Sequence, residues 1–175
     1  MLKDINQSVQ MGMDGRALMP IAGIVRGLLQ IGCNTLGESA QLEDVVRLVE
    51  SMSGTRIVGT AAGELPPARQ KRLLSVIDKA TAVCNRWVTQ EALMMGVKQG
   101  LEPGRLVGAV QASSGWSQVL EKLGAAAVSL PDASDLDLVA SHLREVTELA
   151  IREGASILVV NEVRSRIEAT AGEAG

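Results

Sequence analysis

Residues 66–99 read PPARQKRLLSVIDKATAVCNRWVTQEALMMGVKQ, and this stretch decides the fold. Two prolines open it, and no further proline interrupts the residues that follow. Pro67 suits the first turn of a helix, where its missing N–H would have no partner in any case. Gly100 follows the stretch and is suited to ending a helix. The sequence therefore predicts one uninterrupted helix about 50 Å long, since each residue adds about 1.5 Å.

The apolar residues of this stretch recur at intervals of three and four. That interval places their side chains on one face of a helix. The members of the face are Leu73, Val76, Ile77, Ala80, Val83, Cys84, Trp87, Met94 and Met95. A helix of this length with one apolar face needs shorter helices packed along it.

Seven shorter segments show the same helical interval. They span residues 2–12, 18–31, 41–52, 103–111, 117–123, 135–153 and 156–169. Gly32 is expected to end the second of them, and residues 125–133 are expected to form a loop around Pro131. The run Ile157–Val160 has β-strand propensity, but no other segment offers it a partner strand, so a helix is preferred. The predicted fold class is all-α, built on one long central helix.

Composition narrows the function classes. The 175 residues are 46% apolar but contain no Phe, no Tyr and only two Trp, so Leu, Val, Ile, Ala and Met must fill the core. The net charge is -3 with no basic block, which argues against nucleic acid as a partner. No apolar run is long enough to span a membrane, and the N-terminus does not resemble a signal peptide. Cys33 and Cys84 lie in apolar patterns, so we expect no disulfide and a cytoplasmic protein.

Motifs for nucleotide or metal chemistry are missing from the sequence. Neither G-x-G-x-x-G nor G-x-x-x-x-G-K-[ST] occurs, and such glycine-rich turns hold the phosphates of a nucleotide. His142 is the sole histidine. Since a metal site needs three or four converging ligands, a solvated His142 is preferred and no metal is expected.

Ser75, Asp78 and Lys79 are predicted to share one face of the long helix, at intervals of three and four. Two interpretations of this face remain open. A Lys or Asp there would serve in acid–base chemistry if the face lined a closed cleft. An exposed polar stripe is the preferred interpretation, because charges on a helix surface are usually solvated.

Three motifs in order resemble the helical domain of the β-hydroxyacid dehydrogenases, the family that includes 3-hydroxyisobutyrate and 6-phosphogluconate dehydrogenases. They are Glu91-Ala92-Leu93, Gly100-Leu101-Glu102-Pro103 and Ser113-Ser114-Gly115-Trp116-Ser117. Members of this family join a nucleotide-binding Rossmann domain to an all-helical C-terminal domain built on one long helix. The resemblance implies a fold like the C-terminal domain of 6-phosphogluconate dehydrogenase.

The N-terminal residues resemble the final helices of such a domain. Lys3-Asp4, Pro20 with the helix after it, and residues 42–51 follow one another as those helices do in the family. The order of the motifs therefore predicts one and a half tandem copies. The expected divisions are a partial helical domain at 1–54, a linker at 55–65 and a second helical domain at 66–175.

The second copy departs from the family where the family keeps its catalytic groups. The resemblance places a proton-transferring lysine sixteen residues before Glu91, where this sequence has Ser75. It places two substrate-orienting amides at Asp78 and Lys79. The resemblance therefore implies that the chain contains no catalytic residue.

The family also has a Lys-Asp pair near the nicotinamide ring of its cofactor. In the second copy this pair reads Ser134-Asp135, and in the partial first copy it is Lys3-Asp4. Lys3 is therefore the one cofactor-binding residue that the resemblance implies, at the start of a helix expected to begin at Asp4.

These observations predict the C-terminal helical portion of an NAD(P)-dependent hydroxyacid dehydrogenase, serving substrate binding and oligomerisation. The chain lacks the Rossmann domain and is not expected to be active alone. We expect no cofactor in this chain, NAD or NADP in its parent protein, and association with a second copy or with the parent's Rossmann domain. Two alternatives remain: a non-catalytic helical interaction or dimerisation module, and an independent enzyme that uses Asp78 and Lys79.

Overall fold

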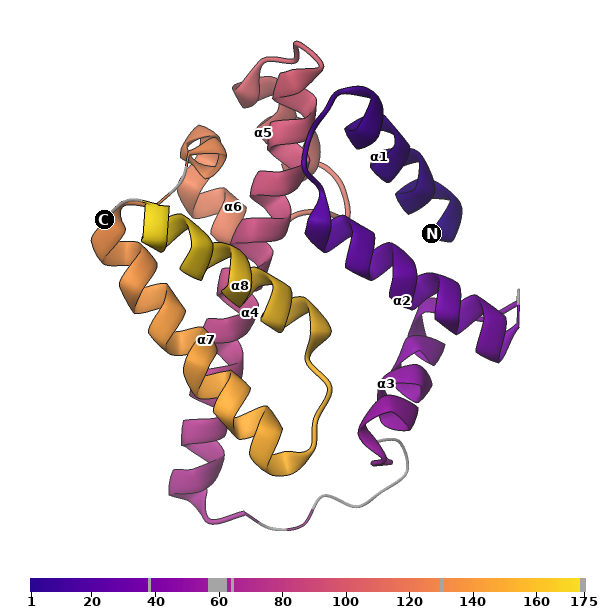
Figure 1. Cartoon of the computed structure of the whole chain (residues 1–175), viewed down its shortest axis with the longest axis vertical. Coiled ribbons are helices and arrows are strands. Elements are labelled where there is room, and N and C mark those ends of the chain that lie inside the picture. The colour runs from indigo at the N-terminus through magenta and orange to yellow at the C-terminus, as the bar shows by residue number, and fades with distance from the viewer. Residues whose placement is uncertain (38, 57–62, 64, 130, 174–175) are drawn as a thin grey trace.

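The structure is a computed structural model that describes residues 1–37, 39–56, 63, 65–129 and 131–173. Within these ranges every regular element is a helix, so the predicted all-α class is confirmed (Figure 1). The elements are α1 (Leu2–Asp14), α2 (Pro20–Leu36), η1 (Leu42–Asp44), α3 (Val45–Ser53), α4 (Pro67–Lys98), α5 (Pro103–Gln111), α6 (Gln118–Leu123), η2 (Gly124–Val128), α7 (Ala133–Glu153) and α8 (Leu158–Glu173). Most of the predicted linker lies outside the described residues, so the domain division stays a prediction.

The predicted long helix is α4, which runs through 32 residues with Pro66 at its N-cap. Its buried face consists of Val76, Ala80, Val83, Trp87, Gln90, Leu93 and Gly96. This face is narrower than predicted, because Ile77 and Met94 are 49% and 36% exposed. The helices that pack on α4 therefore leave part of each of these two side chains uncovered.

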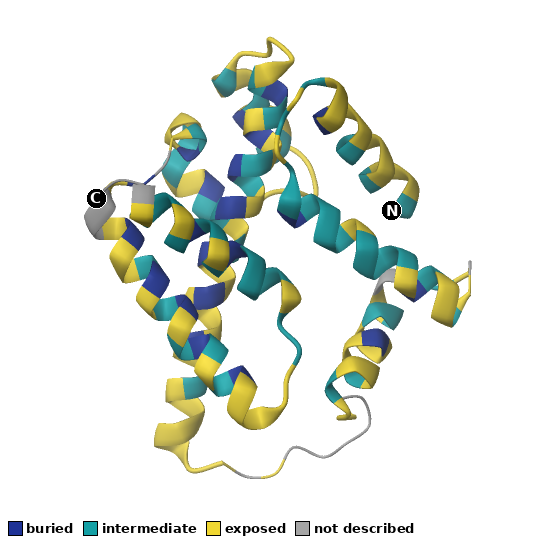
Figure 2. Ribbon diagram, in the orientation of Figure 1, coloured by how far each residue is buried: buried dark blue, intermediate teal, exposed yellow. Residues whose placement is uncertain are grey.

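Two clusters of buried side chains lie along α4. The larger joins the middle of α4 to α7 and α8, and Ile21 of α2 completes it. The smaller joins Leu93 of α4 to Val107, Leu120 and Ala127 from α5, α6 and η2. Figure 2 shows the buried residues of α4, α7 and α8 on the sides that these helices turn toward one another. The C-terminal two thirds of α4 is therefore the element that both clusters share.

Helices α7 and α8 form an antiparallel pair against α4. Gly154 ends α7 with φ 67°, a left-handed conformation that favours glycine. The run Ile157–Val160 is helical from Leu158 onward, so the preference for a helix over a strand is confirmed. Two exposed ion pairs tie α7 to the start of α4: Arg72 to Glu145 at 3.2 Å and Arg69 to Glu153 at 3.7 Å. Their exposure limits what each contributes to stability.

The N-terminal helices α1, α2 and α3 lie beside this assembly, with α2 in contact with α4 and α8 (Figure 1). Two expectations about this part were wrong. Helix α1 begins at Leu2, as the helical interval of residues 2–12 predicted, and not at Asp4, where the Lys-Asp pair had placed its start. Helix α2 does not end at Gly32 but continues to Leu36. Gly32 is buried inside the helix beside Leu48 of α3, and a Cβ built there would make an ordinary van der Waals contact with Leu48 at 3.8 Å.

The stretch expected to be a loop around Pro131 is also partly helical. Residues 124–128 form the 3-10 helix η2, and Ala127 is fully buried in the smaller cluster. Three consecutive alanines have no side chains that obstruct a tight turn, and their small size allows η2 to lie close to α4. The amphipathic interval used to find helices does not register a single turn of this kind.

Candidate functional site

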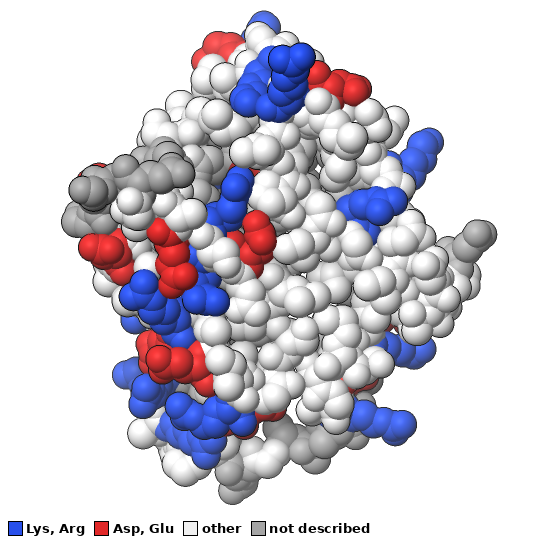
Figure 3. Space-filling model, viewed as in Figure 1, with Lys and Arg blue, Asp and Glu red and all other residues white. Residues whose placement is uncertain are grey.

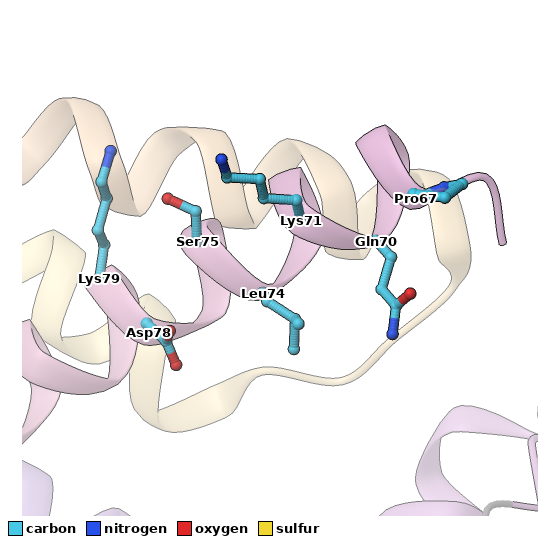
Figure 4. Close-up of a pocket in the computed structure, with 7 residues that line it drawn as sticks. All are labelled: Pro67, Gln70, Lys71, Leu74, Ser75, Asp78 and Lys79. Atoms are coloured by element: carbon cyan, nitrogen blue, oxygen red, sulfur yellow. The ribbon is translucent and has the colours of Figure 1, made fainter.

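The polar face at the start of α4 holds the positions where the family resemblance places catalytic groups. A hollow of about 460 Å³ lies there, and every residue that lines it belongs to α4. Figure 4 shows Lys71, Ser75 and Lys79 pointing to one side of the helix and Asp78 to the other. The predicted shared face therefore holds for Ser75 and Lys79 but not for Asp78. All four side chains are exposed, as the interpretation as solvated side chains expected, but Asp78 does not belong to the stripe.

This hollow does not have the form of a catalytic cleft. No hydrogen bond or ion pair joins Ser75, Asp78 and Lys79 within the described part of the chain. A general base must lie within hydrogen-bond reach of the proton that it removes, and here a single helix surface offers no opposite wall. The structure thus gives no support to an independent enzyme that uses Asp78 and Lys79.

Lys3 lies in the first turn of α1 with an exposed side chain. Its ammonium makes no hydrogen bond or ion pair with any residue in the described ranges. The opposite end of α1 is the one that contacts the long helix, since Gln99 donates to the Met11 carbonyl at 3.3 Å. Figure 1 shows the start of α1 well apart from the start of α4. The structure therefore does not bring Lys3 together with Ser75.

A second hollow lies where α2, α4 and α8 meet. This junction cavity has a volume of about 490 Å³, and its lining includes Leu18, Ile21, Gln90, Glu91, Met94 and Arg166. Its walls come from α2, α4, α8 and η2 and from the connection before α2. A largely apolar cavity with a few polar groups is the usual form of a small-molecule site.

Glu91 connects α4 to the first turn of α2. Ile21 N–H donates to one carboxylate oxygen at 3.1 Å and Ala22 N–H donates to the other at 2.9 Å. Helix α2 starts at Pro20, which has no N–H, and no side chain of its own caps it. Glu91 therefore serves as its N-cap from a distant part of the chain, against the positive end of the helix dipole.

Burial controls the acidity of Glu91. Loss of hydration raises the pKa of its carboxyl group above the usual value, because burial disfavours the charged form. The two backbone hydrogen bonds and the charge of Arg166 act in the opposite direction but do not outweigh burial. The sequence marked Glu91 only as part of a family motif. Its capping role was not predicted, although Met19-Pro20 without a polar cap residue was a local sign that α2 needed an external one.

Two neighbours of Glu91 carry buried polar atoms without partners. Trp87 Nε1 and Gln90 Oε1 make no hydrogen bond within the described residues. The Gln90 amide group is held from its other end, since Nε2 donates to the Val128 carbonyl at 3.3 Å. Buried polar groups normally have a hydrogen-bond partner. The α4 wall of the junction cavity is unusual because it carries two that do not.

The remaining candidate residues lie apart from both hollows. Burial raises the pKa of the Cys84 thiol to about 11, so it is not a nucleophile at neutral pH. His142 is half-buried on α7. The described residues contain no group of three or more His, Cys, Asp or Glu side chains placed to hold a metal ion. Among the described helices, none has the length and apolar character needed to cross a membrane.

The all-helical fold, with the Glu-Ala-Leu motif late in the long helix and the Gly-Leu-Glu-Pro motif just after it, is the arrangement that the resemblance to the helical domain of the hydroxyacid dehydrogenases implied. The comparison with family models agrees. Residues 75–175 match the family described as the NAD-binding domain of NADP-dependent 3-hydroxyisobutyrate dehydrogenase, and the chain belongs to that family. Searches of curated proteins and of solved structures found no match.

The family match begins within α4 and continues to the end of the chain. It coincides with the predicted second helical domain except for the first turns of α4. It does not include α1, α2 or α3, so the idea that residues 1–54 are the end of an earlier copy stays a prediction.

Proposed function

We propose that the chain is the helical portion of an NAD(P)-dependent hydroxyacid dehydrogenase and that it does not transfer hydride by itself. The observation that carries the proposal is the family match over residues 75–175, combined with Ser75 at the position of the family's proton-transferring lysine. The function proposed for the domain is to supply one wall of an active site and to associate subunits.

A dinucleotide does not fit the residues of this chain alone. The family is described as NAD-binding, but pyrophosphate is usually held by a glycine-rich turn at a helix N-terminus, and the sequence has no such motif. The open hollow on α4 has one wall and encloses nothing. We therefore propose that a Rossmann domain of the parent protein completes the dinucleotide site.

Titration calorimetry with NAD and with NADP tests this proposal. We expect no binding tighter than about 1 mM, which corresponds to about 4 kcal/mol. A matched titration on an intact dehydrogenase of the family provides the positive control. A micromolar dissociation constant for the isolated chain would overturn the proposal.

Lys3 is proposed to act in the parent protein through its charge. The side chain is exposed and has no partner among the described residues, so its ammonium is available to a neighbouring cofactor or substrate carboxylate. A charge-assisted hydrogen bond contributes about 1.5–3 kcal/mol. In the full-length parent, Lys3→Ala should lower kcat/KM by roughly ten- to a hundredfold, whereas Lys79→Ala should change it by a small factor. A larger loss of kcat/KM in Lys79→Ala than in Lys3→Ala would mean that the functional residues lie in the second copy and not in the first.

Self-association is proposed for the surface around α2. Leu18 is 75% exposed and Ile31 is 50% exposed. Figure 3 shows a broad surface without charged residues over α2 and the start of α8. Exposed apolar patches of this kind usually mark an interface. Light scattering should therefore detect a dimer or larger species at micromolar concentrations, and a stable monomer would count against the proposal.

The second candidate function is a helical interaction module that has lost catalysis. The chain has Ser75, Asp78 and Lys79 at the positions where the family has its catalytic side chains, and this difference favours an interaction module. The DNA upstream of Met1 separates the two candidates. A reading frame with G-x-G-x-x-G supports the dehydrogenase, and an unrelated upstream frame supports the module.

A further inference from the structure

The junction cavity is a site separate from the positions of the dehydrogenase chemistry. Its α4 wall includes Gln90 and Glu91, which follow Ser75 by fifteen and sixteen residues. At about 1.5 Å per residue, this places them roughly 24 Å further along the helix. A ligand in the junction cavity would therefore not occupy the hollow at the start of α4.

The walls of the cavity are mostly aliphatic. Leu18 comes from the connection before α2, Ile21 from the first turn of α2, Met94 from α4 and Val128 from η2. The volume of about 490 Å³ lies in the range of small-molecule sites. The predominance of aliphatic side chains favours a ligand with an aliphatic body.

Arg166 of α8 is the charged group that remains available. Arg166 lines the cavity and is half-buried, and its side chain makes no hydrogen bond or ion pair with the described residues, although its charge acts on Glu91. Lys98 also lines the cavity, but its ammonium donates to the Arg16 carbonyl at 2.7 Å. The Glu91 carboxylate already accepts the two N–H groups of α2. An incoming anion thus finds one fork of unused donors, and carboxylates match that fork in shape.

We propose that the junction cavity binds an aliphatic monocarboxylate, with its carboxylate on Arg166 and its chain against Leu18, Ile21 and Met94. The ligand would contact α2 on one side and α4 and α8 on the other. Binding therefore holds the N-terminal helices against the rest of the fold. Glu91 lines the cavity, and Glu162 lies close enough to act on its charge, so both carboxylates oppose an incoming anion and Glu162→Gln should tighten binding.

The chain offers a built-in optical probe for this site. Trp87 lines the cavity and Trp116 is 55% exposed in a loop. The sequence has no other tryptophan and no tyrosine. A Trp116→Phe variant therefore reports on Trp87 alone. Its fluorescence would be titrated with octanoate, octylamine and octanol, which share an aliphatic chain and differ in charge, and each titration would be repeated by calorimetry.

The expected result is octanoate binding below about 1 mM, at least about tenfold tighter than octylamine, with octanol between them. Arg166→Gln in the same background should weaken octanoate about tenfold or more and remove the preference for the anion. Arg105→Gln changes an exposed arginine of α5 outside the cavity and should leave binding unchanged. If Arg166→Gln does not fold, Arg166→Lys keeps the charge without the fork and should retain a weaker preference for the anion.

Several results would overturn the proposal. One is the absence of octanoate binding by both methods. Another is equal binding of octylamine, which would mean that the cavity recognises only the aliphatic chain. A third is an equal loss of affinity in Arg105→Gln and Arg166→Gln, which would mean that the anion binds elsewhere. Hydrogen exchange adds an independent readout, since bound octanoate should slow exchange in α2 but leave α5 unchanged.

Discussion

The three N-terminal helices and the helices from α4 onward are built in different ways. Helices α4 to α8 contain two clusters of buried side chains. In α1, α2 and α3 the buried residues are Gly12, Ile21, Gly32 and Leu48, and two of these are glycines. Ile21 belongs to the cluster centred on α4, α7 and α8. The N-terminal helices therefore depend on contacts with the rest of the chain and have no comparable core of their own.

The difference predicts an order of stability. Residues 67–173 should keep their fold when the N-terminal helices detach, but the reverse should not occur. Regions with few buried apolar contacts open at lower free energy than the core. The following experiments test whether the N-terminal helices are less stable than residues 67–173 and measure the difference.

The largest effect should come from Leu143→Ala in α7. Leu143 is 0% exposed in the larger cluster, and truncating a core leucine costs about 2–5 kcal/mol. Because α2 relies on this cluster, hydrogen exchange should accelerate in both parts of the chain. Leu48→Ala in α3 is the matched control and should accelerate exchange only in α2 and α3. Equal acceleration in α7 from Leu48→Ala would show that the N-terminal helices are part of a single cooperative core.

A smaller loss of stability is expected from Gly96→Ala. A Cβ at Gly96 would lie 2.7 Å from both methyl carbons of Leu106, so the Leu106 side chain, or α5 with it, would have to shift. Overpacking of this kind costs about 1–3 kcal/mol in urea unfolding. Gly27→Ala in α2 has nothing within 4 Å of the new Cβ and should stabilise α2 by up to about 1 kcal/mol. A stabilising Gly96→Ala would mean that α5 packs less closely than described.

Glu91→Ala should release the N-terminal helices specifically. It removes the acceptor for the Ile21 and Ala22 N–H groups, and loss of an N-cap costs about 0.5–2 kcal/mol. Limited proteolysis should cut within α1 to α3 more readily while residues 67–173 persist as a fragment. Glu102→Ala, which removes the cap of α5, should leave the N-terminal helices protected.

The smallest effect should appear in the pH dependence of stability, where two capping carboxylates act in opposite directions. The pKa of Glu91 is raised, so its contribution is fully present below the unfolded pKa and is lost as pH rises through the folded pKa. The pKa of Glu102 is lowered by hydrogen bonds from the Gly104 and Arg105 N–H groups, so its contribution is present above the unfolded pKa and is lost as pH falls through the folded one.

Urea midpoints measured across the acid range should separate these two contributions. The free energy of unfolding of the wild type minus that of Glu91→Gln should fall with rising pH. The free energy of unfolding of the wild type minus that of Glu102→Gln should increase with rising pH. Slopes of the same sign would contradict the opposite environments of the two caps.

The sequence predicted what depends on local periodicity. The interval of three and four located α4 almost to the residue, and the bounds of α5 were correct. It did not predict that Gly32 lies inside α2, because a glycine that ends a helix and a glycine within a helix look alike in sequence. It also did not predict the cap on α2, since Glu91 lies 69 and 70 residues from its partners. The role of Lys3 stays a prediction because its proposed partner belongs to the parent protein.

The cap on α2 also constrains which positions of the sequence can change during evolution. Glu91 bonds to the main-chain N–H groups of residues 21 and 22, and every residue except proline supplies such a group. The side chain at position 22 is therefore free to vary with respect to this interaction, whereas the acceptor at position 91 is not. In an alignment of homologues, the contact should leave a one-sided signature: an acidic residue retained at position 91 with no co-varying partner. Methods that infer contacts from paired substitutions would miss it, even though it joins the two halves of the molecule.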